Sequence, residues 1–142
     1  MTREEQLRWR FMHEEPLAQD MGAVLLDLEV GYAVIEVPIV NELMIREQIV
    51  QGGIGVVVAD FAGVYAAMME LQDAHAPARQ MHFYLERPIL ATDGVIRAEA
   101  RVVNTSASSI TVEVVVVGPL PDRKVRTRGT IMFMRPKSEN RP

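Results

Sequence analysis

One acidic residue, Asp60, stands inside a long apolar segment of the chain. Apart from Asp60, each residue from Ile54 to Met69 is apolar, a glycine or a tyrosine. A carboxylate in such surroundings is costly to bury unless it has a polar partner or a chemical task, such as abstracting a proton or attacking an electrophilic carbon. A structural carboxylate that is hydrogen-bonded to backbone at a subunit boundary satisfies the same physics. The residues alone leave both interpretations open.

Two glycines, Gly52 and Gly53, lie where a helix containing Asp60 is expected to begin. Glycine lets a ligand approach the unpaired backbone N–H groups of a first helical turn. Such a terminus favours negative charge, including the charge that develops on a carbonyl oxygen during acyl transfer. A tight loop or close packing against another chain is the alternative. The occurrence of Asp60 two turns further along the same helix favours the functional interpretation.

The composition is that of a folded globular domain of acidic character. The chain has 142 residues, 49% hydrophobic and 24% charged, which predicts one domain spanning 1–142. The net charge of −4 argues against nucleic acid as a partner. The absence of cysteine excludes disulfides, thiolate zinc sites and a cysteine nucleophile. The histidines show no metal-ligand spacing, so no metal is expected.

Neither the N-terminal stretch nor the apolar segment has the pattern of a targeting or membrane sequence. Residues 1–15 are charged from Arg3 onward and lack the apolar centre of a secretory signal, which predicts a cytoplasmic protein. The segment from Ile49 to Met69 approaches membrane-spanning length, but it carries four glycines and an acid at its middle. We therefore expect a buried helix and no membrane partner.

The remaining patterns predict one helix before the apolar segment and strands on both sides of it. Thr2 and Glu5 match a capping box for an N-terminal helix within 1–15 that ends before Pro16. Alternating residues predict a hairpin over 23–38 that turns at Gly31. Residues 41–51 are expected to form a loop or short turn.

Four further β-rich runs follow the apolar helix. They cover 81–88, 95–103, 110–117 and 125–134 and are separated by turn-forming groups, which predicts an antiparallel meander. No helices stand between them to support parallel crossovers, so the fold class is α+β, with a sheet curling around one long helix that is apolar on every side. Residues 136–142 are expected to be a flexible tail.

A set of motifs spread over about 16–133 is typical of one known family: Gln51-Gly52-Gly53, Asp60, the strand ending in Leu85-Glu86-Arg87-Pro88, and the 98–103 and 128–130 stretches. In these motifs the chain resembles the hotdog-fold acyl-CoA thioesterases of the phenylacetic-acid-degradation (PaaI-like) type. The resemblance implies a homodimer or a dimer of dimers whose sheets join edge to edge, with active sites at the subunit boundary. The Gly52 amide would polarise the thioester carbonyl, and Asp60 of the partner subunit would attack it or activate water. No metal or redox cofactor is implied, and coenzyme A is part of the substrate.

The chain departs from the family pattern at three positions. The family usually has His where this chain has Gln51, and commonly Asn and Gly where this chain has Ile45 and Gln48. Gln51 can still donate and accept hydrogen bonds, whereas Ile45 makes its part of the site more apolar. These departures keep open an alternative function, a non-catalytic hotdog protein that binds acyl-CoA or another hydrophobic ligand. A hotdog dehydratase ranks last, because the Asp and His pair usual for that chemistry is absent.

Further residues are expected to complete the site. Gln51 and Gly53 join Gly52 and Asp60 as catalytic candidates, and the residues assigned to substrate binding are Ile45, Gln48, Tyr65, Arg87 and Arg128. The two arginines could meet the phosphates of coenzyme A, although basic residues on exposed strands are often simply solvated.

Overall fold

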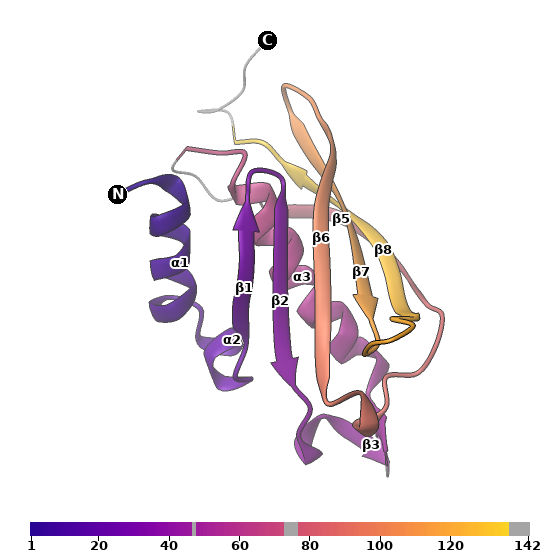
Figure 1. Ribbon diagram of the computed structural model, residues 1–142. Coiled ribbons are helices and arrows are strands. Elements are labelled where there is room, and N and C mark those ends of the chain that lie inside the picture. The colour runs from indigo at the N-terminus through magenta and orange to yellow at the C-terminus, as the bar shows by residue number, and fades with distance from the viewer. Residues whose placement is uncertain (47, 73–76, 137–142) are drawn as a thin grey trace.

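The fold is a six-stranded antiparallel sheet with one long helix packed across one face (Figure 1). The computed structural model describes residues 1–46, 48–72 and 77–136. The strand order is β1-β2-β6-β7-β8-β5. The strands of this sheet are β1 (Val24–Glu29), β2 (Tyr32–Pro38), β5 (Ala78–Leu85), β6 (Val95–Thr105), β7 (Ser109–Val117) and β8 (Val125–Met134). The predicted α+β class is confirmed, and the tail at 137–142 lies outside the described residues.

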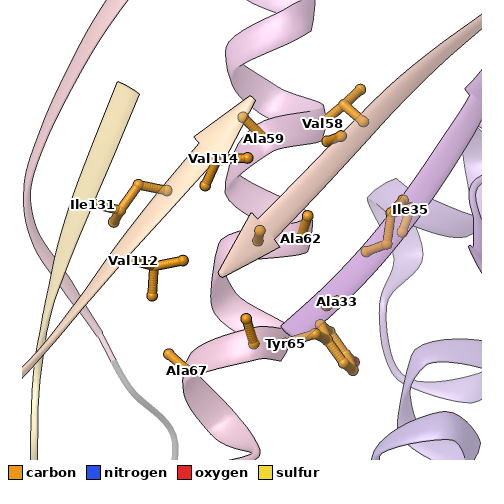
Figure 2. Close-up of a cluster of buried hydrophobic side chains, with 14 of the residues drawn as sticks. Ala33, Ile35, Val58, Ala59, Ala62, Tyr65, Ala67, Val112, Val114 and Ile131 are labelled. Atoms are coloured by element: carbon orange, nitrogen blue, oxygen red, sulfur yellow. The ribbon is translucent and has the colours of Figure 1, made fainter. Parts of the chain in front are cut away.

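The long helix α3 (Gly52–Met68) lies against the sheet through its small residues. Ala59, Ala62 and Ala66 are fully buried, and their short side chains allow the helix backbone to approach the strands closely. Strand residues that alternate along β2, β7 and β8 point at the helix, and Ile35, Val112 and Ile131 are examples in the cluster of Figure 2. The core is therefore the layer between α3 and one face of the sheet. None of the described helices is long and apolar enough to cross a membrane.

The N-terminal helix forms as the capping box predicts. In α1 (Arg3–His13) the Glu5 backbone N–H donates to the Thr2 hydroxyl over 3.1 Å, and the Glu5 carboxylate accepts from the Thr2 N–H over 2.9 Å. Leu7 and Phe11 bury one side of the helix beside β1. A second short helix, α2 (Pro16–Asp20), was not predicted. It begins at Pro16, a residue that suits the first turn of a helix.

The loop expected over 41–51 contains more structure than predicted. A 3₁₀ turn, η1 (Asn41–Leu43), is followed by two short antiparallel strands, β3 (Met44–Arg46) and β4 (Ile49–Val50). A second 3₁₀ turn, η2 (Ala91–Asp93), precedes β6. Val50 N–H donates to the Ile89 carbonyl over 2.9 Å, so the β3–β4 ribbon is tied to the chain that follows β5.

The predicted meander is correct for β6, β7 and β8 but wrong for β5. The first of the four strands pairs with β8, at the opposite edge of the sheet from β1. Gly129 of β8 explains this docking, because a Cβ there would overlap the His82 carbonyl oxygen and the Phe83 ring of β5. Phe83 occupies that space and packs against the core. The sequence pattern showed the strand but not its neighbour.

Candidate functional site

Helix α3 begins at Gly52, and the preceding backbone is held on both sides. Gln51 N–H donates to the Leu43 carbonyl over 2.9 Å, which fixes the residue that caps the helix. The Gln51 side chain makes no capping hydrogen bond and is exposed. Among the described residues nothing accepts a hydrogen bond from the amides of Gly52 and Gly53. These two N–H groups carry the positive end of the helix dipole.

A cavity of about 230 Å³ lies beside Gly52. Its walls come from three separate parts of the chain: the β3–β4 ribbon, the segment that follows β5, and the start of β8. The lining residues include Ile45, Val50, Gly52, Leu85, Arg87 and Thr127. A cavity with an apolar lining and a few polar groups is the usual form of a small-molecule site.

Ile45 and Arg87 are the two predicted substrate-binding residues that line this cavity. Ile45 is 52% exposed on β3 and contributes an apolar side chain to the cavity wall. Gln48 does not line the cavity. It has a φ of 70°, and its carbonyl accepts from Ala91 N–H over 2.9 Å. Glycine adopts this left-handed conformation most readily. This preference accounts for the glycine that PaaI-like thioesterases commonly have at the position of Gln48.

The two predicted arginines occupy different places around Glu86. Arg87 Nη1 donates to the Val125 carbonyl over 2.9 Å at the rim of the cavity. Arg128 lies on the exposed face of β8, where its Nε is 3.2 Å from the Glu86 carboxylate. Both guanidinium groups stand near the same carboxylate, since Arg87 is 3.9 Å from it. Arg128 is therefore close to the site but outside the cavity.

Asp60 lies on the side of α3 that faces away from the sheet. On this side Val57, Phe61 and Val64 are also only partly buried. The prediction that other structure encloses the helix on every side is therefore wrong for the single chain. Burial raises the pKa of Asp60 above its ordinary value. Eight residues separate Asp60 from Gly52, which corresponds to about 12 Å along a helix axis. The two groups of one chain are therefore too far apart to act on the same carbonyl carbon.

Tyr65 points toward the N-terminal helices. Its side chain is 2% exposed, its hydroxyl donates to the Glu15 carboxylate over 3.2 Å, and its ring meets Phe11 edge-on at 5.2 Å. Burial, and then the charge of Glu15, raise the pKa of the Tyr65 hydroxyl. Thirteen residues of helix, about 20 Å, separate it from Gly52. The structure does not bring Tyr65 to the cavity of its own chain.

Sequence reasoning missed most of the other residues that line the cavity, among them Leu85 and Thr127. The Leu85 side chain lies over Gly52, with its Cδ2 2.5 Å from where a Cβ on residue 52 would stand. Thr127 faces the helix from β8, on the same side of that strand as Gly129, Ile131 and Phe133. A threonine among the apolar residues and glycine of the inward face of β8 was the available signal.

A second hollow, of about 320 Å³, opens on the other face of the sheet. Its charged lining residues already have partners. Arg97 contacts Glu36 at 3.0 Å and Glu99 at 2.8 Å, and Arg123 also pairs with Glu99. The charged groups of this hollow are therefore less available to bind a ligand than the unpaired amides beside the cavity at Gly52.

Comparison with known proteins identifies the class of fold. No protein-family model and no curated protein sequence matches the chain. Among solved structures, the PaaI protein of the E. coli phenylacetic acid degradation operon matches with a TM-score of 0.81 at 20% identity, over 95% of each chain. A mutant PaaI from Thermus thermophilus matches at 0.76 and 25% identity, over 86% of this chain and 100% of that one. A thioesterase from Haemophilus influenzae matches at 0.78 and 14%, over 92% and 87%.

The chain therefore has the hotdog fold. The resemblance to PaaI-like hotdog thioesterases that Gln51-Gly52-Gly53 and Asp60 suggested is confirmed by these structures. At these identities the likeness establishes the fold and leaves the reaction to be argued from the site.

Proposed function

We propose that this protein is an acyl-CoA thioesterase that works as a homodimer, alone or within a dimer of dimers. The observation that carries the proposal is the start of α3, where the unpaired Gly52 amide stands beside a cavity lined by Ile45, Leu85 and Arg87. A thioester carbonyl oxygen placed there accepts a hydrogen bond that strengthens as charge develops on it. The exposed Arg87 at the rim suits the phosphate-bearing end of coenzyme A.

The second subunit supplies the carboxylate. Asp60 is about 12 Å from Gly52 within one chain, so a complete site needs the Asp60 of a partner. Two features support such a partner: β5 is an edge strand with its outer side unpaired by any described strand, and the side of α3 that carries Asp60 is only partly covered. Pairing of two β5 edges is the dimer that the family resemblance implies.

The reaction needs no group beyond these residues and water. The Asp60 carboxylate takes a proton from water as the oxygen attacks the carbonyl carbon, and the resulting oxyanion is held at the Gly52 amide. The C–S bond then breaks, and the thiolate of coenzyme A takes up the proton. Direct attack by Asp60 would form an anhydride instead. Hydrolysis in ¹⁸O-water under single-turnover conditions tests the anhydride route: water that attacks the Asp60 carbon of the anhydride leaves ¹⁸O in the Asp60 carboxylate, so label found there demonstrates this route, whereas general-base hydrolysis and attack on the acyl carbon both place ¹⁸O only in the product acid.

The alternative is a hotdog protein that binds an acyl-CoA or another hydrophobic ligand without turnover. Ile45 favours it, since this apolar side chain occupies a cavity wall where the family commonly has an amide. Gln51 adds to it, because its exposed side chain does not cap the helix.

The decisive assay measures thiol release from short, aromatic and medium-chain acyl-CoAs, with Asp60→Asn as the control. We expect turnover by the parent protein and its loss in Asp60→Asn. Binding without turnover would favour the alternative. An Asp60→Asn protein as active as the parent would overturn the mechanism.

Mixing two variants, each first shown to be inactive alone, tests the shared site. In a heterodimer of Gly52→Ala and Asp60→Asn chains, one of the two sites has both groups intact. Random mixing should therefore restore about a quarter of parental activity. Absence of recovery in a mixture shown to contain heterodimers would contradict the shared site.

A further inference from the structure

The structure describes two polar residues with almost fully buried side chains, Asp93 and Thr127. Asp93 is satisfied, because its carboxylate accepts two hydrogen bonds from Arg126, at 2.8 and 2.9 Å. Thr127 is 1% exposed, and within the described ranges no hydrogen bond of its hydroxyl is found. The hydroxyl is not among the fully enclosed side-chain atoms that lack a partner, so it keeps a little access to the cavity. A nearly buried hydroxyl is still stabilised by a polar partner, which a ligand in the cavity would supply.

The Thr127 hydroxyl stands at the cavity beside Gly52. Thr127 lines this cavity, and its Oγ1 is 3.2 Å from where a Cβ on Gly55 would lie. Gly55 is three residues beyond Gly52 in α3, or about 4.5 Å along the helix axis. The hydroxyl is therefore one helical turn further into the protein than the amide that would hold a carbonyl oxygen.

The exposure of the lining shows which end of a thioester would reach Thr127. Arg87 stands at the exposed rim, whereas Thr127 and Ile89 are buried. The large, charged coenzyme A has to leave by the rim, so the acyl group enters toward Thr127. An extended chain advances by about 1.2 Å per bond, so about 4.5 Å corresponds to three or four bonds from the carbonyl.

We propose that the Thr127 hydroxyl hydrogen-bonds an oxygen substituent on the acyl group, and that the preferred substrates are thioesters with a hydroxyl or oxo group near carbon 3. This inference rests on the proposed function and names the substrate class of that site. A site with an unpaired polar group disfavours a ligand that lacks the matching atom, because binding then leaves the hydroxyl dry and unpaired. A plain acyl chain of the same length is the disfavoured ligand.

Binding to an inactivated protein tests the inference separately from turnover. In an Asp60→Asn background, titration calorimetry compares 3-hydroxybutyryl-CoA with butyryl-CoA. We expect the hydroxylated thioester to bind about five- to tenfold more tightly. Thr127→Val, which keeps the shape and removes the hydroxyl, should abolish the preference. Thr127→Ser should retain it and controls for altered packing.

The outcomes separate the two proposals. Equal affinity for both thioesters, or a preference that survives Thr127→Val in a protein with parental thermal stability, would overturn the role of Thr127 alone. A uniform loss for both ligands in Thr127→Val would also overturn it, because the hydroxyl would then serve only packing or a bound water. Binding of neither thioester by any variant would sink the thioesterase proposal and the substrate class with it.

Discussion

The Leu85 side chain of β5 covers the first residue of α3, with Cδ2 2.5 Å from the position that a Cβ on Gly52 would take. Glycine at 52 therefore serves two purposes. It leaves the amide accessible from the cavity, and it lets the edge strand close over the start of the helix. The neighbouring Gly53 has open space at the same position, with nothing within 4 Å.

Gly52→Ala should destabilise the fold by less than about 1 kcal/mol, because the added methyl group meets only the far end of the flexible, exposed Leu85 side chain, which can turn away. Combining it with Leu85→Ala should remove most of that penalty relative to Leu85→Ala alone. Urea unfolding of the four proteins measures the coupling. Gly53→Ala is the matched control and should be neutral or stabilising by up to about 1 kcal/mol. Equal losses at 52 and 53 would contradict the packing described.

The pH dependence of turnover should reflect the buried position of Asp60. Burial raises the pKa of Asp60 above its ordinary 3.8. The carboxylate is the reactive form, so kcat/KM should fall as pH decreases through this raised value. The acid limb of the profile should thus begin at higher pH than a solvent-exposed aspartate would give. A profile that is flat down to pH 4 would exclude Asp60 as the titrating group.

Asp60→Asn should stabilise the protein at neutral pH while it removes activity. The folded chain binds a proton at Asp60 more readily than the unfolded chain, so this residue favours folding below pH 3.8. That contribution is lost as pH rises through the folded pKa, where the charge must be buried. Melting temperatures of parent and variant should therefore differ at pH 7 and converge below pH 3.8. A lower melting temperature for the variant at pH 7 would show that the carboxylate has a stabilising partner.

Among the described ion pairs, Asp93–Arg126 should contribute most to the free energy of unfolding. The side chains are 4% and 14% exposed, and the Arg126 carbonyl also accepts from the amides of Glu86 and Arg87 beside the cavity. Asp93→Ala leaves a guanidinium almost buried and unpaired, so a loss of about 3–5 kcal/mol is expected in chemical unfolding. The exposed Glu4–Arg8 pair is the comparison, and Glu4→Ala should cost less than about 0.5 kcal/mol.

Tyr65→Phe should affect stability rather than turnover. It removes the hydrogen bond to Glu15 and should cost about 1 kcal/mol, whereas Tyr84→Phe, at a side chain 72% exposed, should cost nothing measurable. Thermal unfolding and thiol-release kinetics of both variants provide the measurement. A selective change in KM for Tyr65→Phe would return this residue to substrate binding, as the sequence predicts.

Features that depend on residues close together in the chain were predictable. The capping box at Thr2 and Glu5, the hairpin around Gly31 and the start of α3 at Gly52 all follow from local patterns. Asp60 could be singled out for the same reason, because a lone acid in an apolar run is visible without any knowledge of the fold.

Only the tertiary structure decided what surrounds these residues. The place of β5 against β8, the cover of Leu85 over Gly52 and the direction of Tyr65 all join segments far apart in the sequence. Local periodicity shows that a strand has an inward face, but not which strand lies beside it. Thr127 is the clearest case, because its nearly buried side chain comes to line the cavity only once β8 packs against α3.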